Sequence, residues 1–95
     1  MMVLVSYDVA RDDHGARRLR KVAKTCQNYG QRVQYSVFEC LVAPDQFVRL
    51  KHELLEIMAD EYDSIRFYLL GANWKNRVEQ YGVKKALDPE GTMII

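Results

Sequence analysis

Residues 2–8 read Met2-Val3-Leu4-Val5-Ser6-Tyr7-Asp8, and this stretch decides the fold. Apolar side chains at every second position from Val3 to Tyr7 alternate with the set that runs from Leu4 to Asp8. The two sets therefore point to opposite faces of a sheet. The strand ends at Asp8, and a segment rich in arginine and lysine follows. A carboxylate at this place suits a metal or phosphate site, or it simply helps the chain to enter a helix.

The segment that follows predicts a helix to about Asn28 with one apolar and one basic face. Asp12 or Asp13 can cap its start by accepting hydrogen bonds from free backbone N–H groups. The predicted core stripe comprises Ala16, Leu19, Val22, Ala23 and Cys26. The predicted basic face comprises Arg17, Arg20, Lys21 and Lys24, with Arg18 at its border. These cations suit contacts with phosphates rather than bases, so binding to nucleic acid would be sequence-tolerant and salt-sensitive. The alternative is a solvated helix face.

The remaining segments predict two further strand regions and a second helix. β-branched and aromatic residues dominate residues 31–43, but no turn residue shows whether they form one long bent strand or two short ones that meet near Ser36. Pro44 and Asp45 begin the second helix. Its core face comprises Phe47, Leu50, Leu54, Ile57 and Met58. Residues 64–70 alternate like the first strand, whereas residues 74–86 are polar, basic and irregular.

This order of elements predicts an α+β fold, the ferredoxin-like β-α-β-β-α-β sandwich. Residues 1–95 form a single domain, with a core at 1–71 and a basic segment and C-terminal strand at 72–95. The apolar tail comprises Thr92, Met93, Ile94 and Ile95. It would be exposed unless it pairs with a sheet edge, and an edge of a second protomer would make an exchanged homodimer. A loose tail is the alternative.

The composition is that of an ordinary globular protein, with 48% hydrophobic and 28% charged residues. The sequence lacks both a secretory signal and an apolar run of the ~20 residues that span a membrane. We therefore expect a cytoplasmic protein without a membrane partner, in which Cys26 and Cys40 are reduced, buried thiols. The net charge is +1, but the charges are segregated along the chain. Residues 11–32 hold seven basic and two acidic residues, and residues 39–63 hold seven acidic and two basic residues. Such a chain can present a cationic face to nucleic acid.

Asp8 is the best candidate for chemistry, although no second carboxylate is better placed than a helix cap. Mg²⁺ takes oxygen ligands and keeps several waters, so one Asp8 from each of two protomers can hold an ion. Two such carboxylates facing each other would repel without a cation or shared protons. A metal there can activate water for phosphodiester hydrolysis. The alternative is that Asp8 only accepts hydrogen bonds from backbone N–H groups at the strand–helix junction.

Three stretches together resemble the CRISPR-associated protein 2 family. They are Tyr7-Asp8 at the end of the first strand, Arg17-Arg18-Leu19-Arg20-Lys21-Val22-Ala23-Lys24, and Gly30-Gln31-Arg32-Val33-Gln34-Tyr35-Ser36-Val37-Phe38-Glu39-Cys40. The basic segment around Trp74 and the ending Asp88-Pro89-Glu90-Gly91 are most similar to members from type I-C systems. The resemblance covers nearly the whole chain, and the combination is more specific than any one part.

The resemblance implies a ferredoxin-like homodimer whose C-terminal strand packs on the partner's sheet. It implies work with the CRISPR-associated protein 1 integrase, in which the dimer bridges two integrase dimers and supports the prespacer, a double-stranded DNA. It also implies metal-dependent nuclease activity on RNA or double-stranded DNA, with one Mg²⁺ (or Mn²⁺) shared by Asp8 of two protomers. The family's other functional residues fall on Arg18 or Arg20, or on Arg17 if the arginine run is shifted, and on Arg32 and Phe38.

Three functions therefore follow from the sequence. The first is a Mg²⁺-dependent endonuclease that also serves CRISPR spacer acquisition. The second is a purely structural DNA-binding scaffold. The third is a generic RNA-binding domain, which is disfavoured because Gln34-Tyr35-Ser36-Val37-Phe38 lacks the glycine pattern of an RNA-recognition motif.

Overall fold

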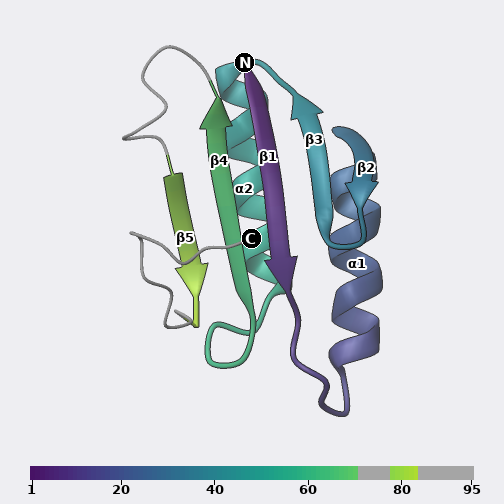
Figure 1. Cartoon of the computed structure of the whole chain (residues 1–95). Coiled ribbons are helices and arrows are strands. Elements are labelled where there is room, and N and C mark those ends of the chain that lie inside the picture. The colour runs from purple at the N-terminus through teal and green to yellow at the C-terminus, as the bar shows by residue number, and fades with distance from the viewer. Residues whose placement is uncertain (71–77, 84–95) are drawn as a thin grey trace.

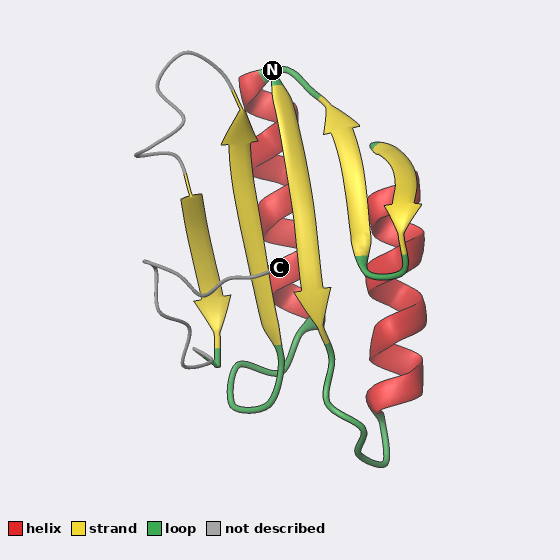
Figure 2. Ribbon diagram, viewed as in Figure 1, coloured by secondary structure: helices red, strands yellow, loops and turns green. Residues whose placement is uncertain are grey.

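The computed structural model describes residues 1–70 and 78–83, which form one antiparallel sheet with two helices on one face (Figures 1 and 2). The strands are β1 (Met2–Asp8), β2 (Gly30–Gln34), β3 (Val37–Leu41), β4 (Ser64–Leu70) and β5 (Val78–Gly82), and the helices are α1 (Gly15–Gln27) and α2 (Pro44–Ile57). The strand order is β2-β3-β1-β4-β5. The predicted β-α-β-β-α-β fold is confirmed, with β5 added at one edge. The predicted C-terminal strand at residues 92–95 lies outside the described residues.

Strand β1 lies at the centre of the sheet and carries the core, as its alternation predicted. Val3 and Val5 are fully buried, and Val3 pairs with Cys40 of β3 on one side and Leu69 of β4 on the other. The helices supply the second layer, where the rings of Phe47 and Phe67 meet edge-to-face with centroids 5.5 Å apart. Both cysteines are buried free thiols, as predicted.

Residues 31–43 resolve into two strands rather than one. Strands β2 and β3 form a hairpin whose turn is at Tyr35 and Ser36. The register shifts between Arg32 and Gln34, and such an irregularity bends a strand without a glycine. The backbone N–H of Tyr7 donates to the carbonyl of Ser36 at 3.1 Å, which ties this turn to the end of β1.

The predicted start and core stripe of α1 are corrected by the structure. The N-cap residue is His14, which makes no side-chain cap, and Asp12 accepts the backbone N–H of His14 at 2.9 Å rather than capping the helix itself. The buried positions are Gly15, Val22 and Cys26, whereas Ala16 and Leu19 are exposed. The helix lies behind the edge pair β2 and β3 and beside α2, so that it buries only a narrow stripe (Figure 1).

The prediction that residues 74–86 are irregular is wrong for residues 78–82, which form β5. Tyr81 pairs with Ile65 of β4, and its ring meets Phe67 edge-to-face with centroids 6.1 Å apart. Glu79 accepts a hydrogen bond from Lys51 of α2 at 2.8 Å. Pairing with β4 and contacts with α2 therefore determine the structure of this segment, although its own β propensity is weak.

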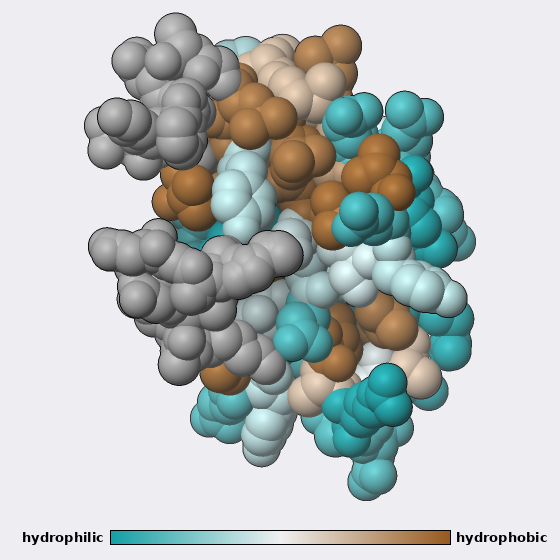
Figure 3. Space-filling view, viewed as in Figure 1, coloured by the Kyte–Doolittle hydropathy of each residue, from teal (hydrophilic) through white to brown (hydrophobic). Residues whose placement is uncertain are grey.

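The face of the sheet opposite the helices carries apolar side chains (Figure 3). Leu4 of β1 pairs with Tyr68 of β4, and Met2 pairs with both Leu41 and Leu70. Leu41 is 72% exposed and Leu70 is 44% exposed. We call Met2, Leu4, Leu41, Tyr68, Leu70 and Val78 the uncovered apolar face.

Candidate metal and nucleic-acid site

Asp8 ends β1 on the same side of the sheet as the uncovered apolar face. It is exposed, and it follows the buried Tyr7, whose side chain points to the helices. Its partner in the register is Ser64, the first residue of β4. The turn at Tyr35 and Ser36 lies beside the same end of β1. Asp8 is therefore accessible on an open sheet face, which suits a ligand site better than a core position.

The described residues of one chain do not form a complete metal site around Asp8. Within residues 1–70 and 78–83, no group of three or more His, Cys, Asp or Glu side chains could hold an ion. Mg²⁺ accepts one or two carboxylates and completes its octahedron with water. Asp8, an exposed residue, would suit such an ion if a second copy of the chain supplied another carboxylate.

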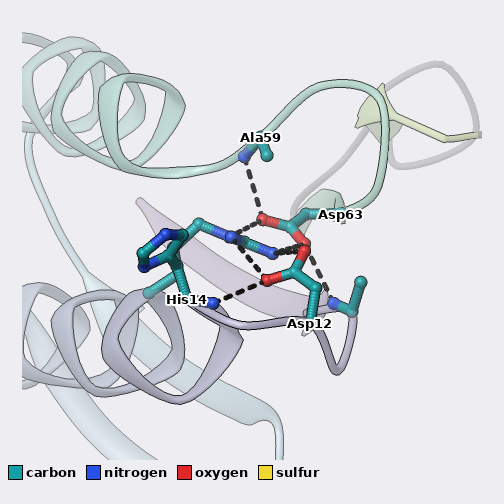
Figure 4. A network of polar contacts seen from close by, with 6 residues as sticks. Asp12, His14, Ala59 and Asp63 are labelled. Atoms are coloured by element: carbon teal, nitrogen blue, oxygen red, sulfur yellow. Dashed lines mark hydrogen bonds and ion pairs between the residues drawn. The ribbon is translucent and has the colours of Figure 1, made fainter.

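Another carboxylate, that of Asp63, makes the backbone contacts considered for Asp8 at the strand–helix junction (Figure 4). Asp63 lies between α2 and β4 and is fully buried. Its Oδ1 accepts the N–H of Ala10 at 2.9 Å, and its Oδ2 accepts the N–H of Ala59 at 2.9 Å. The sequence pattern missed this role, because Asp63 closes the acidic run Asp60-Glu61-Tyr62-Asp63 and two of its partners, Ala10 and Arg18, lie far along the chain.

Arg18 lies between two carboxylates, with its side chain 14% exposed. Its Nε donates to Asp63 Oδ2 at 2.7 Å, and its Nη2 donates to Asp63 Oδ1 at 3.1 Å. Its Nη1 and Nη2 donate to the two oxygens of Asp12 at 3.1 and 2.9 Å. The position of Arg18 at the border of the basic face is confirmed, but its guanidinium is engaged within the chain. We therefore leave Arg18 out of the nucleic-acid surface that we propose.

This network favours charge on all three side chains. Burial opposes ionisation of Asp63, but hydrogen bonds from Arg18, Ala59 and Ala10 outweigh it and hold the pKa of the carboxyl below its ordinary value. The hydrogen bond from Arg18, together with the N–H of His14, also lowers the pKa of Asp12. Both carboxylates raise the pKa of Arg18.

The predicted basic face of α1 is exposed, but α2 places acidic groups beside part of it. Arg17 and Lys21 line a groove of about 560 Å³ between the helices. Glu53 and Glu56 of α2 line the same groove, so they reduce the positive potential there. Two further cations of the basic face, Arg20 and Lys24, are exposed and lie outside this lining.

The two predicted contacts beyond α1 have different surroundings. Phe38 is fully buried and stacks with Tyr7, their centroids 6.2 Å apart. Its ring is part of the core, so its burial lends no support to the predicted contact with nucleic acid, which stays a prediction. Arg32 is exposed, and its guanidinium carbon lies 5.3 Å from the centroid of the Phe38 ring. Arg32 is therefore exposed while its guanidinium contacts the Phe38 ring and hydrogen-bonds Tyr7, and its contact with nucleic acid stays a prediction.

The family model of CRISPR associated protein Cas2 matches residues 1–78 of the chain. The chain belongs to the Cas2 family. Among the described residues of this Cas2 chain, neither helix is long and apolar enough to cross a membrane.

Relatives are similar over the full length of the chain. The CRISPR-associated endoribonuclease Cas2 of Nitratidesulfovibrio vulgaris is 62% identical over 100% of this chain and 94% of its own length. The CRISPR-associated endonuclease Cas2 of Halalkalibacterium halodurans is 53% identical over 99% of each chain. The crystal structure of Streptococcus pyogenes Cas2 at pH 6.5 superposes with a TM-score of 0.71 and 61% identity, covering 83% of this chain and 96% of that chain. Cas2 proteins thus carry the names of RNA-cleaving and of general nucleic-acid-cleaving enzymes.

Proposed function

We propose that this Cas2 chain is a CRISPR adaptation subunit that binds nucleic acid as a homodimer and cleaves phosphodiester bonds of RNA or double-stranded DNA with Mg²⁺ (or Mn²⁺). The observation that carries the proposal is the position of Asp8. It is an exposed carboxylate at the end of the central strand, on the uncovered face of the sheet. The names of its relatives supply the reaction class.

The uncovered apolar face supports the dimer. Leu41, Leu70 and Val78 are each at least 44% exposed there. Contiguous apolar surface of this kind marks an interaction site, and a two-fold axis lets one patch cover its own copy. Because Asp8 lies on the same side of the sheet, such packing would bring two Asp8 residues toward each other.

In this dimer the two Asp8 carboxylates would hold one metal ion. The ion supplies positive charge at the phosphodiester and favours ionisation of the attacking water. Arg20, Lys24 and Arg32 would contact the phosphates of the bound strand, so that affinity falls as salt rises. Asp8 would bind and orient the metal ion, and in this proposal it transfers no proton.

The proposed partners are the CRISPR-associated protein 1 integrase and a prespacer duplex, in the cytoplasm. The dimer would bridge two integrase dimers and support the duplex between them. A scaffold without nuclease activity is the second candidate. It is favoured because residues 1–70 and 78–83 hold no group of three or more His, Cys, Asp or Glu side chains that could bind a metal ion.

Asp8→Ala tests the proposal. We expect Mg²⁺-dependent cleavage to disappear, while nucleic-acid binding and dimerisation persist. Asp13→Ala, which removes an exposed carboxylate from the neighbouring loop, is the control and should leave cleavage unchanged. Cleavage by Asp8→Ala at the wild-type rate would reject the nuclease assignment. A spacer-acquisition assay with the integrase, run on the same variants, then decides whether the scaffold alone suffices.

Charge reversal of Arg20 and Lys24 tests the binding surface. We expect Arg20→Glu with Lys24→Glu to weaken nucleic-acid binding and to reduce the slope of log K against log salt by about 0.7–0.9 for each phosphate that the variant no longer neutralises. Arg49→Glu, the same change at an exposed position of α2, is the control. An equal loss of nucleic-acid affinity in the α1 variant and in Arg49→Glu would refute a specific binding surface on α1.

A further inference from the structure

Asp63, which lies between α2 and β4, binds the segment that joins Asp8 to α1. Ala10, two residues after Asp8, donates its N–H to Asp63 Oδ1 at 2.9 Å. The other oxygen of the same carboxylate binds the N–H of Ala59, at the end of α2. Asp63 therefore joins the end of β1 to the segment between α2 and β4, and its burial excludes water from the contact.

Arg18 holds this carboxylate in one orientation. Its Nε and Nη2 bind both oxygens of Asp63 in the paired geometry that fixes a carboxylate plane. Its outer edge binds Asp12, whose Oδ1 also accepts the N–H of His14 at 2.9 Å. The residues between Asp8 and α1 are thus fixed at Ala10 by Asp63 and at His14 by Asp12, with Arg18 between the two acids (Figure 4).

Two glycines show how closely the chain packs around this network. A Cβ on Gly15 would lie 2.1 Å from the carbonyl oxygen of Ala10. A Cβ on Gly82, whose φ is +92°, would lie 2.1 Å from the carbonyl oxygen of Asp63. That carbonyl accepts the N–H of Val83 at 2.8 Å. The side chain of Asp63 therefore binds the end of β1, while its backbone binds the end of β5.

We propose that Asp63 and Arg18 are positioning residues for Asp8, which they hold in register with the rest of the sheet. The inference rests on the proposed metal site. Two Asp8 residues on separate protomers can share one ion only if each is held within a few tenths of an ångström, because Mg²⁺ accepts its ligands in a narrow range near 2.0–2.1 Å. A misplacement of about 1 Å can cost on the order of 100-fold in rate.

The test compares Arg18→Met and Asp63→Asn with Asp60→Asn, which makes the same acid-to-amide change at an exposed site of the same loop. We expect hydrogen exchange at the Ala10 amide to accelerate by about 10-fold or more in the first two variants. Single-turnover cleavage should fall by about 10–100-fold, while the affinity for uncleaved nucleic acid stays within about twofold. Binding of Mn²⁺, followed by its electron paramagnetic resonance spectrum, should weaken in parallel. Asp60→Asn should match the wild type in every measurement.

A second variant covers the case in which Asp63→Asn fails to fold. Gly15→Ala adds a Cβ that clashes with the carbonyl of Ala10, and it leaves every charge of the network in place. It should therefore also slow cleavage without weakening nucleic-acid binding. Wild-type cleavage and Mn²⁺ binding by folded Arg18→Met would overturn the positioning role, even if exchange at Ala10 increases. Failure of the proposed function looks different, because Asp8→Ala would then cleave as fast as the wild type.

Discussion

Replacement of Asp63 by asparagine should destabilise the fold well beyond an ordinary surface change. The carboxylate accepts hydrogen bonds at both oxygens, from Ala10 at Oδ1, from Ala59 at Oδ2, and from Arg18 at each. An amide has one oxygen, so its NH₂ group must face the N–H of either Ala10 or Ala59. One part-buried donor is then left unpaired, and the guanidinium loses its buried counter-charge.

The magnitude follows from these two effects. An unpaired buried donor costs about 1–3 kcal/mol, and the weakened pair with a buried charge adds to it, so we expect about 2–4 kcal/mol in total. For a domain of this size each 1 kcal/mol lowers the midpoint of thermal unfolding by about 4–8 °C. The predicted shift is therefore about 8 to 32 °C, and a chain with the ordinary stability of about 5–15 kcal/mol stays folded at room temperature.

The assay is chemical and thermal unfolding followed by circular dichroism, at one protein concentration because the proposed dimerisation would add to the apparent stability. Asp60→Asn is the matched control and should change the free energy of unfolding by less than about 0.5 kcal/mol. A destabilisation by Asp63→Asn that does not exceed this control would refute the view that the buried carboxylate stabilises the fold.

Three further predictions concern pH, backbone contact and association. The pKa of Asp63 is lower in the folded chain than in the unfolded chain, so its stabilisation is present above the ordinary carboxyl pKa of about 4 and is lost as pH falls through the folded value; acid unfolding of wild type should be steeper than that of Asp63→Asn, and parallel curves would contradict this. Gly82→Ala should destabilise the chain and raise hydrogen exchange in β5, because its Cβ would meet the Asp63 carbonyl at 2.1 Å and its φ is +92°; Glu61→Ala in the exposed loop is the control, and unchanged exchange would argue against the contact. Leu41→Lys should shift the dimer toward monomer in sedimentation equilibrium, whereas Val48→Lys, at a 60% exposed site on α2, should not; an equal effect of the two would exclude the uncovered apolar face as the interface.

The sequence predicted those parts of the fold in which hydrophobic periodicity and burial agree. Val3, Val5, Phe67 and Leu69 alternate along strands that are covered on one face, so their pattern reports their environment directly. The pattern failed in α1, because periodicity cannot show how much of a helix its neighbours cover. Leu19 fits an apolar stripe but remains 42% exposed beside a sheet edge.

Parts of the candidate site could not be predicted, because they depend on contacts between distant residues. The turn at Tyr35 and Ser36 has no glycine or asparagine to mark it, and β5 is a strand through its pairing with β4. Arg18 and Asp63 are 45 residues apart, so no local pattern links them. A cation at the border of a basic helix face looks like a nucleic-acid contact until its buried partner is known. Charge alone therefore could not show that the guanidinium of Arg18 is paired within the chain.

The two aspartates differ in a way that separates structure from chemistry. Both lie at the junction of β1 and β4, since Asp8 pairs with Ser64, the residue next to Asp63. Asp63 is buried, and its oxygens accept hydrogen bonds from three residues, so a metal ion would have to displace donors that hold the loops together. Asp8 is exposed on the open face, where an ion can approach with its waters. In the dimer that we propose, Asp63 would fix the backbone and the neighbouring Asp8 would bind the ion. The rigidity of Asp63 would then determine how well the two Asp8 residues can share that ion.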